Sequence, residues 1–242
     1  MHRPYVSEPQ TAKDKIIIPL DVPDRSQALR LVERLGTEVS WFKIGLQLFS
    51  AEGPALVGEI RGTGVNVFLD LKLHDIPNTV RHAVAAVANL DVQMLTIHLL
   101  GGVEMCQAAV TGRGTAQVLL LGVTVLTSHT DGTLRETGFR TTVDDEVLLL
   151  GDLAKGTGIT GLVASPKEVP FLRAHYGSVF TIVTPGVRPS WSEAGDQRRF
   201  VTPADAIRAG ADYLVIGRPV TAAPDPREAL RRIIDEIAGM PD

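Results

Sequence analysis

The chain has 242 residues, of which 44% are hydrophobic and 21% are charged, as in an ordinary soluble globular protein. Its formal net charge of −4 argues against a nucleic-acid binder, which would carry a basic surface, although a few cations in one cleft could still hold a small anion. The longest apolar stretch, residues 118–126, is far shorter than the ~20 residues that cross a bilayer, so we expect no membrane contact.

The N-terminal segment and the cysteine content indicate in which cellular compartment the protein occurs. Residues 1–15 are polar and lack the apolar segment of a signal peptide. Cys106 is the single cysteine, so the chain cannot form an internal disulfide, and its apolar neighbours favour a buried thiol. We therefore expect a cytoplasmic protein.

Eight short apolar runs recur along the chain. Each is nearly continuous in Val, Ile, Leu or Phe, which is typical of a strand buried on both faces of a parallel sheet. In chain order, the predicted strands are residues 16–21, 41–45, 66–72, 94–99, 118–125, 161–165, 180–184 and 213–217.

Segments with helical periodicity separate these runs. In residues 26–35 the apolar side chains fall mostly on one face, and Pro203 and Pro226 suit the first turn of a helix. Eight strand–helix units in a chain of this length favour an α/β fold, a single-domain (β/α)₈ TIM barrel, over a doubly wound sheet, because none of the apolar runs leads into the GxGxxG phosphate fingerprint of that fold. We expect an N-terminal tail over residues 1–14 and the barrel, as the catalytic domain, over residues 15–242.

Two connections between predicted strands are unusually long. They cover residues 126–160, after the fifth strand, and residues 185–212, after the seventh. Long loops on the C-terminal side of barrel strands often form active-site lids. We therefore expect these two loops to border the active site.

Polar residues cluster at the C-terminal ends of the predicted strands, where barrel active sites form. They are Asp21, Lys43, Asp70, Lys72, Asp75, Thr127, Ser128, Gly217 and Arg218. Asp70 and Lys72 lie two residues apart, so strand alternation points both into the barrel. Such a pair could be a structural ion pair. With Lys43 and Asp75 added, however, the four residues would form an alternating network that can hold a lysine ready as an acid.

The sequence around these residues resembles the orotidine 5′-monophosphate decarboxylase family. The most specific segment is DLKLHDIPNT, residues 70–79. Further similar segments occur in family order: LD (20–21), FKIG (42–45), VLTS (125–128), TPGVRP (184–189), DQ (196–197) and IGRP (216–219). The resemblance covers roughly residues 15–238. A DxKxxD pattern alone would be weaker evidence, because related phosphate-binding barrels share it.

The resemblance implies the last step of de novo uridine monophosphate synthesis, without cofactor or metal, in a homodimer. Lys72 would protonate C6 after carbon dioxide leaves, and Asp70 would face the substrate carboxylate. The remaining residues implied for the site are Lys43 and Asp21 at the ribose, Thr127 and Ser128 at the pyrimidine, Pro185, Arg188, Gln197, Gly217 and Arg218 at the phosphate end, and Asp75, Ile76 and Thr79 reaching the partner subunit's site.

Two other functions remain open. A magnesium-dependent sugar-phosphate decarboxylase or aldolase on the same barrel would share Asp70, Lys72 and Asp75, but two lysines disfavour a divalent cation. A catalytically silent nucleotide-binding module should have lost a charged residue, and none is missing. His74 lacks a second nearby ligand for a metal, and we expect Trp41 and Phe42 to pack outward against helices.

Overall fold

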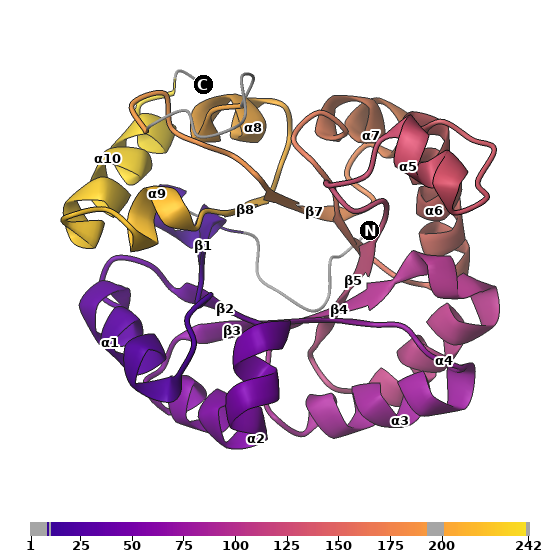
Figure 1. Cartoon of the computed structure of the whole chain (residues 1–242), viewed down its shortest axis with the longest axis horizontal. Coiled ribbons are helices and arrows are strands. Elements are labelled where there is room, and N and C mark those ends of the chain that lie inside the picture. Colours follow the sequence, from indigo (N-terminus) through magenta and orange to yellow (C-terminus); the bar gives the residue numbers. More distant parts are fainter. Residues whose placement is uncertain (1–8, 10, 193–200, 241–242) are drawn as a thin grey trace.

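The computed structural model describes residues 9, 11–192 and 201–240. Eight parallel strands form a closed barrel in chain order, and helices surround it (Figure 1). The strands are β1 (Ile16–Pro19), β2 (Trp41–Gly45), β3 (Asn66–Leu73), β4 (Met94–His98), β5 (Leu119–Val123), β6 (Gly161–Val163), β7 (Thr181–Pro185) and β8 (Tyr213–Val215). The predicted (β/α)₈ fold is therefore confirmed, and each predicted run overlaps one strand.

The helices follow the strands around the outside of the barrel. They are η1 (Ala12–Lys15), α1 (Arg25–Leu35), α2 (Leu46–Gly62), α3 (Pro77–Ala88), η2 (Leu99–Gly101), α4 (Gly102–Arg113), α5 (Asp131–Glu136), α6 (Val143–Thr157), α7 (Val169–Tyr176), α8 (Pro203–Arg208), α9 (Arg218–Thr221) and α10 (Pro226–Ala238). Pro203 and Pro226 begin their helices, as predicted. None of the helices in the described ranges is long and apolar enough to cross a membrane.

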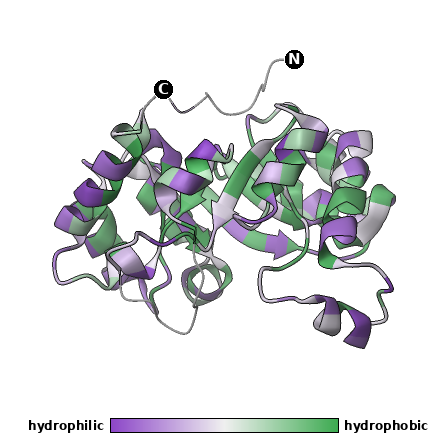
Figure 2. Ribbon diagram, turned by 90° about the horizontal axis from the view of Figure 1, so that it is seen from above, coloured by the Kyte–Doolittle hydropathy of each residue, from purple (hydrophilic) through white to green (hydrophobic). Residues whose placement is uncertain are grey.

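The apolar residues form two cores, as expected when both faces of the strands are buried. The larger core lies between strands and helices, and the smaller fills the barrel. The inner core consists of Ile17, Trp41, Phe68, Met94, Leu119, Leu121, Val183 and Tyr213, with Val163 and Val215 against it. Figure 2 shows green, hydrophobic stretches along the strands in the interior, while the surrounding helices alternate between hydrophobic and hydrophilic residues.

The orientation expected for Trp41 is wrong. Its ring lies inside the barrel, with its centroid 5.4 Å from that of Tyr213 in an edge-to-face arrangement. Trp41 and Lys43 are two residues apart on β2, so they share the inner face, whereas Phe42 between them packs in the outer core. The tryptophan thus closes the barrel beneath the charged end of the strand.

Most predicted strands extend slightly beyond the observed ladders. β1 ends at Pro19, two residues before Asp21, and β8 ends at Val215, two residues before Gly217. Asp21 and Gly217 therefore lie just beyond the regular ladder, whereas Lys43, Asp70 and Lys72 lie within β2 and β3. The connection after β5 contains the additional short helix α5 before α6.

Candidate active site

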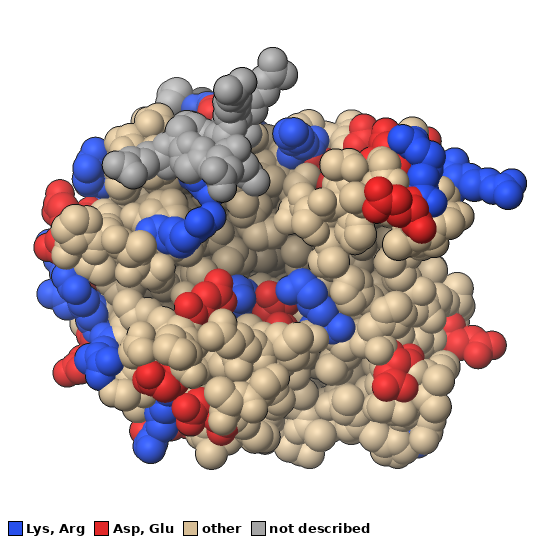
Figure 3. Space-filling view, viewed as in Figure 1, with Lys and Arg blue, Asp and Glu red and all other residues tan. Residues whose placement is uncertain are grey.

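A cleft of about 380 Å³ opens at the C-terminal ends of the strands. We call it the mouth cleft. Its polar and turn residues are Asp21, Lys43, Asp70, Lys72, Thr127, Pro185, Gly186, Arg188, Gly217 and Arg218, and apolar residues of β3 and β5–β8 line its base. Figure 3 shows acidic and basic side chains gathered around the central hollow. The volume lies in the range of small-ligand sites.

Four residues of the mouth cleft form a charged network: Asp21, Lys43, Asp70 and Lys72. Lys43 Nζ lies 3.2 Å from Asp21 Oδ1 and 3.4 Å from Asp70 Oδ2, and Lys72 Nζ lies 2.7 Å from Asp70 Oδ1. The side chains of Lys43 and Asp70 are 10% and 12% exposed, whereas that of Lys72 is 38% exposed. Of the two lysines, Lys72 is therefore the one that is more accessible to a ligand.

The environment of Asp70 favours its charged form. Burial by itself would raise the pKa of this carboxyl group, but Lys43 and Lys72 and the hydrogen bonds from Lys72 and Thr96 outweigh burial and lower the pKa below its ordinary value. Asp70 is therefore a fixed negative charge within the cleft.

The backbone at Lys72 departs from a regular strand. Its φ is +50°, in the left-handed region that non-glycine residues rarely adopt, and the β3–β4 register shifts between Leu69 and Leu73. Strand alternation correctly predicted that Lys72 lies beside Asp70, but the backbone brings them together through the left-handed φ and the register shift and not through a regular strand. Strain of this kind is often found at functional sites.

Thr96 contacts both members of the Asp70–Lys72 pair, and the sequence analysis did not single it out. Its Oγ1 donates a hydrogen bond to Asp70 Oδ1 at 2.9 Å and accepts one from the backbone N–H of Lys72 at 2.8 Å. The available signal was a hydroxyl side chain inside the apolar run at residues 94–99, but nothing in the sequence says what it meets.

The opposite side of the mouth cleft carries two arginines. Arg218 begins α9 directly after Gly217, and Arg188 lies on the loop after β7, close to Pro185. A Cβ atom at residue 217 would lie 3.2 Å from Pro19 Cγ, so glycine permits a close approach there. Gln197 lies outside the described residues.

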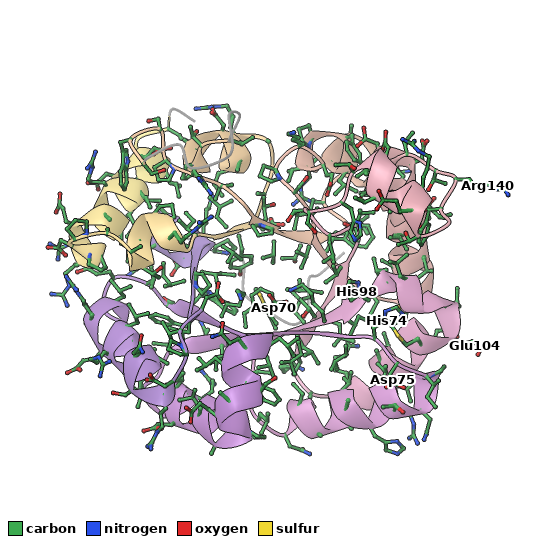
Figure 4. The ribbon with its side chains drawn as sticks, in the orientation of Figure 1. Asp70, His74, Asp75, His98, Glu104 and Arg140 are labelled. Carbon is green, nitrogen blue, oxygen red and sulfur yellow. The ribbon has the colours of Figure 1, made fainter. Side chains whose placement is uncertain are left out.

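Four of the predicted site residues do not line the mouth cleft. Asp75, Ile76 and Thr79 are exposed at the start of α3, and Asp75 Oδ1 accepts a hydrogen bond from the Ile76 N–H at 2.7 Å. Figure 4 shows Asp75 toward the outer helices, away from Asp70. Ser128 is exposed next to Thr127. Within one chain, Asp75 therefore does not join the charged network.

Two histidines lie beside the network. The rings of His74 and His98 are 5.5 Å apart, and Figure 4 shows the two residues as neighbours. Burial, His74 and Lys72 together lower the pKa of His98, which favours its neutral form. No group of three His, Cys, Asp or Glu residues suited to a metal ion occurs in the part of the chain that the structure covers.

Comparisons with known proteins agree on one family. The sequence profile described as "Orotidine 5′-phosphate decarboxylase / HUMPS family" matches residues 14–233. The orotidine 5′-phosphate decarboxylase of Moorella thermoacetica is 50% identical, covering 93% of both chains, and that of Rhodopseudomonas palustris is 47% identical, covering 96% of this chain and 98% of its own. The crystal structure of the Lactobacillus acidophilus orotidine 5′-phosphate decarboxylase superimposes with a TM-score of 0.82 at 36% identity, over 93% of this chain and 99% of that one.

Proposed function

This chain belongs to the orotidine 5′-phosphate decarboxylase / HUMPS family, and from that premise we infer that it decarboxylates orotidine 5′-phosphate to uridine 5′-phosphate and carbon dioxide. One observation carries the mechanism that we propose: the ion pair of Asp70 and Lys72 lies in the same cleft as Arg188 and Arg218. The reacting carbon and its carboxylate would lie at Asp70 and Lys72, and the phosphate would lie at Arg188 and Arg218.

Lys72 is the proposed general acid. The bond between C6 and the carboxylate breaks, its electron pair stays on C6, and carbon dioxide leaves. Lys72 Nζ then gives a proton to C6 and regains one from solvent. Because the pyrimidine ring delocalises the anion at C6 poorly, preorganised positive charge beside C6 is the main source of stabilisation. Asp70 would repel the substrate carboxylate, and we treat that repulsion as a secondary contribution.

The remaining residues of the cleft would bind the nucleotide. Asp21 and Lys43 suit the ribose hydroxyls, and Thr127 and Ser128 the edge of the pyrimidine. Arg218 and Arg188 supply forked donors for the phosphate, with Pro185, Gly217 and Gln197 beside them. Binding the distant phosphate would convert remote binding energy into a lower barrier at C6.

We further propose that the enzyme is a homodimer in which Asp75, Ile76 and Thr79 complete the partner subunit's site. Two observations support this proposal. Asp75 lies outside its own chain's mouth cleft, and the apolar side chains of Ile76, Leu100 and Val103 are 66%, 40% and 50% exposed. Figure 3 shows a largely uncharged surface over α3 and α4. Exposed apolar side chains on a largely uncharged face are typical of an interface.

Incubation of the purified protein with orotidine 5′-phosphate tests the function directly. Decarboxylation removes the conjugated carboxylate, so the ultraviolet absorbance of the substrate should fall as uridine 5′-phosphate forms. No change in absorbance at high enzyme concentration, with a folded protein, would contradict the function.

Activity should survive a strong chelator followed by exhaustive dialysis. The proposed step uses lysine as the acid and needs no Lewis acid, whereas a magnesium-dependent decarboxylase or aldolase on the same barrel would lose its cation. The measurement is kcat before and after treatment, with and without added magnesium. Loss of activity that magnesium restores would favour the rival enzyme.

Arg218→Ala should lower kcat/KM by about 10- to 100-fold, because a hydrogen bond between charged groups is worth about 1.5–3 kcal/mol. Orotidine, which lacks the phosphate, should be a poor substrate of the unchanged enzyme and nearly insensitive to this substitution. Arg208→Ala is the control, because Arg208 lies on α8 outside the cleft and pairs with Asp205. Equal losses with both substrates would mean that Arg218 does not act through the phosphate.

A further inference from the structure

One buried hydroxyl connects the two residues proposed to act at the reacting carbon. Thr96 lies in the middle of β4 and is completely buried. Its Oγ1 donates to Asp70 Oδ1 and accepts from the backbone N–H of Lys72. A hydroxyl group has one proton and two lone pairs, so these contacts fix its orientation from both sides.

The contact with Lys72 gives the backbone N–H of this residue a hydrogen-bond acceptor. Where the β3–β4 register shifts, the Lys72 N–H donates to the Thr96 side chain. The left-handed φ of Lys72 is unfavourable for a residue with a Cβ atom and persists only where its surroundings hold it. The Thr96 hydroxyl is one of the groups that hold it.

The contact with Asp70 fixes the carboxylate between the two lysines. Oδ1 accepts from both Thr96 Oγ1 and Lys72 Nζ, while Oδ2 faces Lys43 at 3.4 Å. Rotation of the carboxylate would break the contact with Thr96. The same hydroxyl therefore sets the orientation of Asp70 and the position from which Lys72 extends.

We propose that Thr96 is a positioning residue of the decarboxylation. It holds Asp70 and Lys72 in the geometry that C6 requires. This role rests on the proposed function and adds a residue outside the lining of the mouth cleft. A small displacement of a reacting group can reduce the rate of a positioned reaction by about 100-fold.

The test compares Thr96→Val, which keeps the shape and removes the hydroxyl, with Thr96→Ser, which keeps the hydroxyl. Thr124→Val is the matched control, because Thr124 is also completely buried but donates to the Val163 carbonyl oxygen at 3.1 Å, away from the charged network. If valine prevents folding at residue 96, Thr96→Ala against Thr124→Ala gives the same comparison.

With orotidine 5′-phosphate as substrate, Thr96→Val should lower kcat by about 10- to 100-fold and change KM by less than about threefold, because the phosphate contacts remain. The kcat values of Thr96→Ser and of Thr124→Val should each stay within about threefold of the kcat of the enzyme without substitutions. This should hold even if both valine variants lose thermal stability. A kcat of Thr96→Val within about twofold of the unchanged enzyme, or equal losses in Thr96→Ser or Thr124→Val, would overturn the proposal. If the enzyme without substitutions has no activity on orotidine 5′-phosphate, that result would instead contradict the proposed function.

Discussion

Replacing Lys72 with alanine is expected to lower kcat by at least about 100-fold, since general acids contribute about 10²–10⁴-fold. The variant should remain folded, because Asp70 keeps Lys43 at 3.4 Å and the Thr96 hydroxyl at 2.9 Å as partners for its charge. A buried carboxylate that keeps some of its partners destabilises the folded state far less than an isolated buried carboxylate does. The measurement is single-turnover decarboxylation, with thermal unfolding as the check on folding.

Lys155→Ala is the matched control for this substitution. Lys155 is an exposed lysine in the last turn of α6 and does not line the mouth cleft, so its loss should leave kcat unchanged. Binding of uridine 5′-phosphate to Lys72→Ala would show that the cleft itself is intact. More than about a tenth of the original kcat in Lys72→Ala would mean that Lys72 is not the proton donor.

Mixing two inactive variants should restore activity if Asp75 acts across a two-fold interface. Lys72→Ala and Asp75→Asn homodimers should each be nearly inactive, because every site in them carries one lesion. In a mixed dimer, the site on the Asp75→Asn chain keeps its own Lys72 and receives an intact Asp75 from the other chain. The second site of that dimer carries both lesions.

Random exchange of equal amounts would make about half of the dimers mixed, so roughly a quarter of all sites should recover. The measurement is kcat per site after exchange, which differently tagged subunits demonstrate independently. As a control, two preparations of the same variant should stay inactive after mixing. If activity stays absent after exchange has been demonstrated, Asp75 acts within its own chain and the shared site is wrong.

The periodicity of the sequence was sufficient to predict the barrel. A parallel strand that is buried on both faces must be apolar along its length, and eight such runs separated by amphipathic segments leave few other folds for a chain of this size. The strand ends were harder to predict, because apolar residues such as Leu20 and Ile216 continue beyond the last ladder pair. Hydrophobicity reports burial, and burial continues past the last ladder pair.

The sequence could also identify the acidic and basic residues of the site, because charges that follow apolar strands stand out from their surroundings. Asp70, Lys72 and Lys43 do meet, at the distances of ion pairs. The exposure of Asp75 within one chain could not be read from the spacing of DLKLHDIPNT. A linear motif does not show which of its residues the folded chain brings to the same cleft.

The sequence by itself thus determined the fold and the acidic and basic residues that meet in the mouth cleft, since both depend on local composition and on strand direction. Only the tertiary structure decided that Trp41 fills the barrel, that Lys72 adopts a left-handed backbone, and that Thr96 connects Lys72 to Asp70. Thr96 and Lys72 are 24 residues apart in the chain. Their contact depends on how β3 and β4 pair and on where their register shifts, and no local pattern in either strand encodes that shift.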